Sequence, residues 1–156
     1  MPEAISQKGL YFEELSLGEM VTTGERTVTE ADILNFSDLS GDHNRMHTDP
    51  DFASRGPFGR PVAHGLLGAS IASGLLVQQL GFLEKTLIAF RELTWKFSLP
   101  IFIGDTIQAR AAISELKPYA RLNSGLVGLT IDLINQDGKI VQTGHWKVLV
   151  KLKPNE

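Results

Sequence analysis

The segment Ala63–Leu83 reads AHGLLGASIASGLLVQQLGFL and is the longest apolar run in the chain. As a helix it would present apolar residues on nearly every side, which in a soluble chain indicates burial. A membrane span needs ~20 strongly apolar residues, but this segment is interrupted by polar side chains, at His64, Ser70, Ser73, Gln78 and Gln79. Its many small residues allow close packing against a sheet, and Gly81 is a natural helix stop. We therefore predict one buried helix and no membrane association.

On either side of this helix the sequence indicates strands. Downstream, the side chains alternate with a period of two, in the segments Leu87–Leu99, Thr106–Leu116, Leu122–Ile134 and His145–Leu152. Asp137-Gly138 is a strong signal for a two-residue hairpin between the last two segments. Upstream, Met20–Val28 is rich in β-branched residues, which favours a first strand. Together these patterns predict an α+β domain with an antiparallel sheet and helices grouped on one face.

Length and composition narrow the classes of protein. A chain of 156 residues suits one domain, and we expect residues 1–19 to be an irregular lead-in and residues 20–156 to form the domain. The net charge of −3, with scattered lysines and arginines, argues against a nucleic-acid partner. The absence of cysteine excludes disulfides and thiolate nucleophiles. Because the first ten residues lack the pattern of a signal peptide, we expect a cytoplasmic protein.

Between the first strand and the buried helix lies the polar stretch Ser40–Pro50, SGDHNRMHTDP. Thr29 is a typical N-cap for a short helix, which we expect to end near Ser40-Gly41. The stretch itself is too polar to bury and too rich in turn residues for a helix or strand, so we interpret it as an ordered loop. At its far end, Asp49 before Pro50 is typical of the start of another helical turn. Titratable groups in an ordered loop are candidates for chemistry.

Asp42 and His47 are the candidate catalytic residues of this loop. An extended chain would separate them by ~17 Å, so only a loop that folds back brings them together. The side chain of Asn44 can stabilise such a turn. Once together, a carboxylate and an imidazole can hold a water molecule, accept its proton and return a proton to a nearby carbon. The alternatives are a solvated turn cap for Asp42 and a surface histidine for His47.

Gly65 begins the buried helix and is the second candidate. An amide in the first helical turn has no partner within the helix, and the helix dipole adds positive potential there. Such a donor can supply roughly 3 kcal/mol to a developing oxyanion. The alternative is a glycine kept only for close packing on the sheet. His64 is interpreted as a hydrogen-bonding residue beside the site. Ser73 lies two turns along on the same side as Gly65, where a small residue facing the sheet is the alternative.

A metal site is weighed and not expected. Asp42, His47 and His64 could form a ligand set, since two histidines and a carboxylate bind iron or zinc in other proteins. However, the chain has no H-x-H or H-E-x-x-H spacing. It also lacks the G-x-S-x-G motif of serine hydrolases and a phosphate-binding glycine loop. We therefore predict no metal.

Several motifs together resemble one known family. They are SGDHNRMHTD (residues 40–49), FA (52–53), PVAHGL (61–66), SGLL (73–76) and FSLPIFIGD (97–105). This pattern resembles the MaoC-like hot-dog family, particularly the (R)-specific enoyl-CoA hydratases, also called hydratase 2, from about residue 20 to the end. Arg45 departs from the family pattern, which usually has a proline after the asparagine.

The resemblance implies a hot-dog domain, a long central helix wrapped by an antiparallel sheet, which forms a homodimer or a dimer of dimers. It implies reversible syn addition of water to a trans-2-enoyl-CoA, giving the (R)-3-hydroxyacyl-CoA for fatty acid metabolism or polyhydroxyalkanoate storage. Asp42 and His47 would activate the water, Asn44 would position it, and Gly65 would polarise the thioester. Ser73 would support the pair, and coenzyme A would enter only as part of the acyl-CoA substrate, without another cofactor. The alternatives are a 3-hydroxyacyl-carrier-protein dehydratase and a non-catalytic acyl-CoA-binding subunit.

Overall fold

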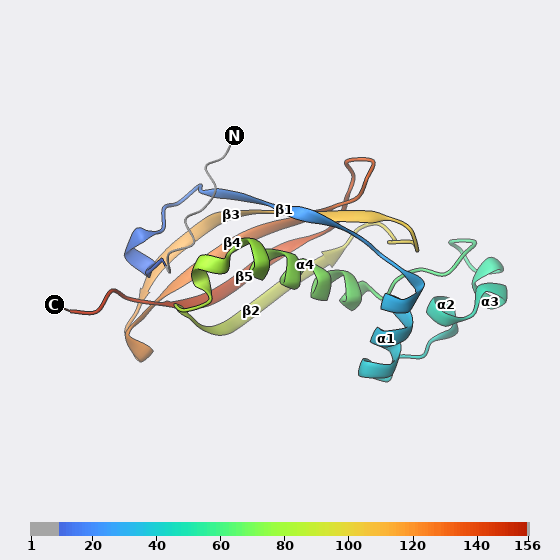
Figure 1. Ribbon diagram of the computed structural model, residues 1–156, viewed down its shortest axis with the longest axis horizontal. Helices are drawn as coiled ribbons and strands as arrows, with labels where there is room; N and C mark the ends of the chain where they lie inside the picture. The colour runs from blue at the N-terminus through green and yellow to red at the C-terminus, as the bar shows by residue number, and fades with distance from the viewer. Residues whose placement is uncertain (1–9, 156) are drawn as a thin grey trace.

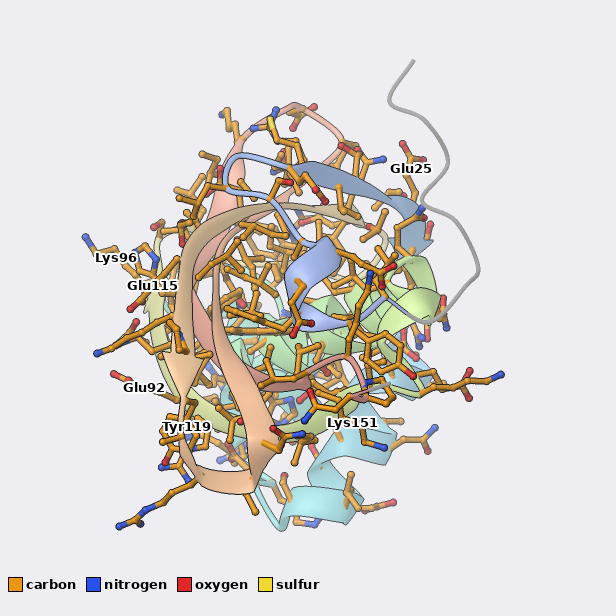
Figure 2. The ribbon with its side chains drawn as sticks, turned by 90° about the vertical axis from the view of Figure 1, so that its left-hand side faces the viewer. Glu25, Glu92, Lys96, Glu115, Tyr119 and Lys151 are labelled. Carbon is orange, nitrogen blue, oxygen red and sulfur yellow. The ribbon has the colours of Figure 1, made fainter. Side chains whose placement is uncertain are left out.

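The computed structural model of the protein describes residues 10–155, apart from the side chain of Phe82. Five strands form one antiparallel sheet in the order β1-β3-β4-β5-β2. They are β1 (Met20–Thr27), β2 (Leu87–Phe97), β3 (Thr106–Tyr119), β4 (Ser124–Ile134) and β5 (Ile140–Lys151). The sheet curls around one long helix, α4 (Gly65–Gln79), as Figures 1 and 2 show. This is the hot-dog arrangement, so the predicted fold class is confirmed.

The remaining helices are short and gather beyond one end of the sheet, near the first residue of α4 (Figure 1). They are α1 (Glu30–Ser40), α2 (Arg45–Thr48) and α3 (Pro50–Ser54). Three single 3₁₀ turns complete the described chain, at η1 (Phe12–Glu14), η2 (Gly81–Leu83) and η3 (Arg121–Asn123). The C-terminus lies at the opposite end of the sheet from α2 and α3 (Figure 1). The sheet thus separates one loop-rich end from one end that carries the C-terminus.

The hydrophobic core lies between α4 and the inner face of the sheet. The helix contributes Leu67, Ile71, Ala72, Leu75 and Leu76, and the sheet contributes side chains that include Val127, Leu129, Ile131, Trp146 and Val148. Small residues bring the helix close to the sheet, as predicted. A Cβ atom added to Gly68 would lie 2.4 Å from Gln142 Nε2 and 2.8 Å from Ile101 Cδ1. The start of α4 is therefore fixed in position by its glycines as well as by apolar burial.

Local signals located α1 and the last hairpin correctly. The Thr29 hydroxyl accepts a hydrogen bond from the Asp32 amide, and Asp32 bonds back to the Thr29 amide. Gly41 ends α1 with a φ of 79°, a left-handed conformation that glycine adopts without strain. Asp137-Gly138 closes the hairpin between β4 and β5, and Asp49 caps α3 with Pro50 in its first turn.

Four expectations need correction or lie partly outside the described residues. The Ser40–Pro50 stretch is not a loop throughout, because it contains α2, whose first turn is capped by the Asn44 side chain. The long helix is shorter than Ala63–Leu83, and β5 begins at Ile140, before the expected His145. Of the expected lead-in, residues 1–9 lie outside the described part, and residues 10–19 contain one 3₁₀ turn. The division of domains at residue 20 stays a prediction.

The edge strand β2 leaves apolar side chains uncovered. Leu93 pairs with Trp146 and Phe97 with Gln142, so these side chains lie on the inner face of the sheet. They are nevertheless 46% and 52% exposed, because β2 is the last strand. On the opposite face, Glu92 and Lys96 point away from the core (Figure 2). No helix among the described residues has the length and apolar character to span a membrane.

Candidate active site

His47 lies in α2 and is oriented by a backbone carbonyl. Its Nδ1 lies 2.7 Å from the carbonyl oxygen of Val62, in the segment that leads into α4. Because a carbonyl only accepts, Nδ1 carries the proton and donates it. Val62 in turn donates its amide to the carbonyl of Met46 at 3.3 Å. These bonds attach α2 to the start of α4 and leave Nε2 as the imidazole nitrogen available for proton exchange.

Asp42 lies just after α1, in a tight turn. Its amide donates to Ser40 Oγ, and its Oδ1 accepts the Asn44 amide at 3.2 Å. The residue is exposed. The turn therefore holds the carboxylate beside α2 and leaves oxygen lone pairs free for a further partner.

His64 is buried between Asp42 and His47 and links them. Its Nε2 lies 3.0 Å from the carbonyl oxygen of Asp42 and 3.1 Å from Ser37 Oγ. Since a carbonyl only accepts, Nε2 carries the proton. The ring stacks on His47 with centroids 3.9 Å apart and also contacts Phe36. Its Nδ1 is buried and has no hydrogen-bond partner in the described part of the chain.

The charge state of His64 follows from this environment. Burial lowers the pKa of His64 below its usual value, and the adjacent His47 ring lowers it further, although the hydrogen bond to the Asp42 carbonyl opposes the shift. The neutral form is therefore favoured. A neutral His64 can position both Asp42 and His47 without placing a positive charge against the His47 ring.

The fold brings Asp42 and His47 together. Side-chain ligand atoms of Asp42, His47 and His64 all lie within 4.8 Å of one another. At this separation a carboxylate oxygen and an imidazole nitrogen can share one water molecule. Asp42, His47 and His64 are also the three residues weighed above as possible metal ligands, and their donor types fit a metal ion. The expected absence of a metal stays a prediction.

Gly65 lies beside this cluster at the first position of α4. Within residues 10–155, the amides of Gly65 and Leu66 make no hydrogen bond. The Gly65 carbonyl accepts a hydrogen bond of 3.0 Å from Gln142 Nε2. A Cβ atom added to Gly65 would lie 2.7 Å from the Phe97 ring. The glycine is thus required for packing, and its amide is also free to bind a ligand.

Two pockets meet at these residues. The first, of about 290 Å³, is lined by Phe36, Ser40, Asp42, His47, His64, Gly65, Leu66 and Phe97. The second, of about 370 Å³, shares His47, Gly65 and Phe97 with the first and extends along residues 98–101. A ligand in the first pocket therefore contacts Asp42, His47 and the start of α4, and a ligand in the second contacts His47 and the start of α4.

Asn44 stabilises the turn as expected, and Ser73 bonds within its own helix. Asn44 Oδ1 accepts the Met46 amide at 3.1 Å and so caps α2. Ser73 Oγ donates to the Ser70 carbonyl at 2.7 Å. Ser73 does not line either pocket in the described chain. The structure therefore does not bring Ser73 to Asp42 or His47 within one protomer.

Sequence analysis missed three groups that hold the site. They are the Ser37 hydroxyl, the Val62 carbonyl and the Gln142 side chain. Gln142 is only 2% exposed and joins three elements, because its Oε1 also accepts a 2.8 Å hydrogen bond from Trp95 Nε1. A single glutamine in an alternating strand gives no local signal for this role. The role of Gln142 becomes visible only through its hydrogen bond to Gly65, which lies 77 positions earlier in the sequence.

The chain is similar in sequence and in fold to several known proteins. The family model for the MaoC like domain matches residues 14–133. An (R)-specific enoyl-CoA hydratase from Aeromonas caviae is 34% identical over 145 residues, which cover 90% of this chain and 97% of the relative. A 3-hydroxybutyryl-CoA dehydratase from Methylorubrum extorquens is 33% identical over 112 residues, which cover 72% of this chain and 69% of the relative. A solved structure described as a monoamine oxidase regulatory protein from Archaeoglobus fulgius is 36% identical, with a TM-score of 0.89 and coverage of 94% and 97%.

Proposed function

Because this chain belongs to the family of MaoC-like domains, we propose that it is an (R)-specific enoyl-CoA hydratase. The two relatives compared by sequence above are a hydratase and a dehydratase, and the protein is an enzyme of the hydro-lyase class. The proposed reaction is the reversible addition of water to a trans-2-enoyl-CoA, which yields the (R)-3-hydroxyacyl-CoA. The observation that carries this proposal is the convergence of Asp42 and His47 beside the free amide of Gly65.

Asp42 and His47 would bind the attacking water from one side. The bond from His47 Nδ1 to Val62 fixes the ring and leaves Nε2 to exchange a proton. Water delivers its hydroxyl to C3 of the substrate and one proton to the pair, and the pair returns one proton to C2. Because both events occur on the side of the pair, addition is syn. The base and acid roles are assigned to the pair and not to either residue alone.

Gly65 would stabilise the charge that develops during this step. Attack at C3 moves electrons through the conjugated system onto the thioester oxygen, which becomes enolate-like. The unpaired amide at the start of α4 is a preorganised donor for that oxygen, and the helix dipole adds to its effect. Gln142 keeps the amide in place through the Gly65 carbonyl. Since protein groups supply the proton exchange and the oxyanion donor, we propose that no further cofactor is required.

A second copy of the chain is the proposed partner. Four exposed apolar side chains, Phe90, Leu93, Phe97 and Leu99, follow the edge strand β2 and the residues after it. An uncovered edge with apolar side chains favours pairing with another sheet. Phe97 and Leu99 also line a pocket of the site, so a homodimer through β2, alone or within a dimer of dimers, would cover the substrate path. We further propose a cytoplasmic location, where acyl-CoA thioesters are present.

The test is the loss of enoyl thioester absorbance when purified protein meets crotonyl-CoA and longer trans-2-enoyl-CoAs. We expect turnover to the (R) product, reduced ~10²–10⁴-fold in Asp42→Asn and in His47→Gln. Light scattering on the same samples should give a dimer or tetramer. No turnover at any chain length, from a folded protein that binds acyl-CoA, would reject the hydratase and favour the non-catalytic binding subunit.

A further inference from the structure

A groove rich in arginine adjoins the candidate active site. It has a volume of about 680 Å³ and lies on the side of α2 and α3, where Arg45, Arg55 and Arg60 line it. These are three of the seven arginines of the chain, and no lysine lies between Lys8 and Lys85. For a protein with a net charge of −3, this is a local concentration of positive charge.

The three arginines of the groove are exposed, and the guanidinium groups of Arg45 and Arg60 are held in place. Arg45 bonds Asp49 Oδ2 through Nε at 3.1 Å and through Nη2 at 2.8 Å, and it also lies over the Phe52 ring. Arg60 lies over the Phe102 ring at 3.8 Å. Neither Arg55 nor Arg60 forms an ion pair with a carboxylate of the described chain. Stacking uses the face of a guanidinium group and leaves its N–H edge free for an anion.

Aromatic rings complete the groove. Phe52 and Phe58 both line it and are 41% and 44% exposed, respectively. Exposed rings beside cationic groups match a ligand that carries both a flat heterocycle and phosphate groups. An acidic peptide would use the arginines but would leave the rings without a stacking partner.

The groove is continuous with the candidate active site. Met46, Phe58 and Val62 line the groove and also the second pocket, which contains His47 and Gly65. A long ligand can therefore contact the arginines at one end and the acid–base pair at the other. Arg45 stands only two residues from His47, so both ends are held by the same short helix, α2.

We propose that this arginine groove binds the adenosine 3′,5′-bisphosphate end of coenzyme A. The proposal rests on the proposed function and makes it more specific, because it selects a coenzyme A thioester over an acyl-carrier-protein thioester. Arg55 and Arg60 contact the phosphates, and Phe52 or Phe58 stacks on the adenine. A carrier protein brings only one phosphate and no adenine, so it leaves most of the groove unused. Arg45 also lines the groove, where its charge is compensated by Asp49.

The test compares two thioesters with the same acyl group. Crotonyl-CoA carries the nucleotide, and crotonyl-pantetheine lacks it. In the double variant Arg55→Gln/Arg60→Gln, we expect KM for crotonyl-CoA to rise about tenfold with kcat unchanged, because charge-assisted bonds to phosphate are lost. Turnover of crotonyl-pantetheine should not change. The matched control is Arg121→Gln. Arg121 is an exposed arginine in η3. It lies just before β4, whose first residue pairs with Lys151 at the other end of the sheet.

Several outcomes would overturn this proposal. Equal losses for both thioesters would mean that the variant disturbs the site itself, and no loss for either would mean that the groove binds neither. A loss confined to crotonyl-acyl carrier protein would assign the groove to a carrier protein instead. Turnover of neither thioester by the unmodified enzyme would reject the proposed function. In that case calorimetry with adenosine 3′,5′-bisphosphate tests the groove directly. Binding to the unmodified protein that is lost in the double variant would support the proposal. No binding to the unmodified protein would overturn it.

Discussion

The two ends of α4 are surrounded by different kinds of space. At its C-terminal end, Leu80 and Leu83 enclose with Val21, Ile113 and other residues a cavity of about 20 Å³, which is almost entirely apolar. At its N-terminal end, Gly65 borders a pocket of about 290 Å³ that contains a carboxylate and two imidazoles. A cavity of this size can hold at most a single water molecule. One helix therefore provides stability at one end and leaves room for a ligand at the other.

The difference arises from residue types along the helix. Leu75 and Leu76 fill the space near the C-terminal end, and Leu76 is fully buried. Gly65 and Gly68 near the N-terminal end let Phe97 and Gln142 approach the backbone instead. Their polar neighbours are satisfied by specific bonds, as between Gln142, Trp95 and the Gly65 carbonyl. Substitutions at the two ends should consequently affect different properties.

Leu76→Ala should have the largest effect on stability. Removing a fully buried leucine side chain costs about 2–5 kcal/mol, from lost burial and the cavity that remains. Denaturant unfolding measures the change, and kcat of the folded variant should stay near that of the unmodified protein. A large fall in kcat at full folding would contradict the separation of the two ends.

Gly65→Ala should reduce activity more than stability. The new Cβ would lie 2.7 Å from Phe97 Cδ1, so the ring or the helix start must shift, at a cost of about 1–3 kcal/mol. The displaced amide should lower kcat toward the ~10²-fold loss typical of one missing oxyanion donor. Gly74→Ala in the same helix is the matched control. Its Cβ would meet nothing within 4 Å. We therefore expect the free energy of unfolding to rise by about 0.5–1 kcal/mol and kcat to stay unchanged.

His64 should make stability depend on pH. Because its pKa is lowered in the folded state, the unfolded chain binds the proton first as pH falls. The free energy of unfolding should therefore decrease as pH falls below ~6.5, the usual histidine pKa, and should level off below the lowered pKa. In His64→Asn the protein should be less stable at neutral pH, with a weaker pH dependence in this window. If the unmodified protein and His64→Asn showed the same pH dependence of the free energy of unfolding, that dependence would belong to other groups.

Removal of metal ions should have the smallest effect. Dialysis against a chelator should leave kcat unchanged, since the proposed chemistry uses protein acid–base groups alone. This experiment distinguishes the two possible uses of the cluster of Asp42, His47 and His64. Loss of activity that a divalent metal restores would show that the cluster is a metal site.

Local sequence patterns predicted much of the fold. The capping residues of α1, the apolar run of α4 and the Asp137-Gly138 turn each act within a few neighbouring residues, so the sequence displays them directly. The short helix α2 was missed because four residues make too few apolar positions for a helical period to show.

The site was predictable only in part. Asp42, His47 and Gly65 stand in recognisable motifs, and the structure brings them to one pocket. The groups that orient them come from distant positions, as with Val62 for His47 and Gln142 for Gly65. Ser73 shows the opposite case, because correct helical spacing placed it two turns from Gly65 but did not bring it to the acid–base pair.

The most direct test of the acid–base pair is the stereochemistry of hydration in deuterium oxide. Crotonyl-CoA is converted by the enzyme, and the configurations at C2 and C3 of the product are read by nuclear magnetic resonance. In the proposed mechanism Asp42 and His47 act from one side, so deuterium at C2 and the hydroxyl at C3 should be added to the same face, with (R) configuration at C3. Anti addition would contradict water activation by this pair, and an (S) product would contradict the proposed (R) specificity.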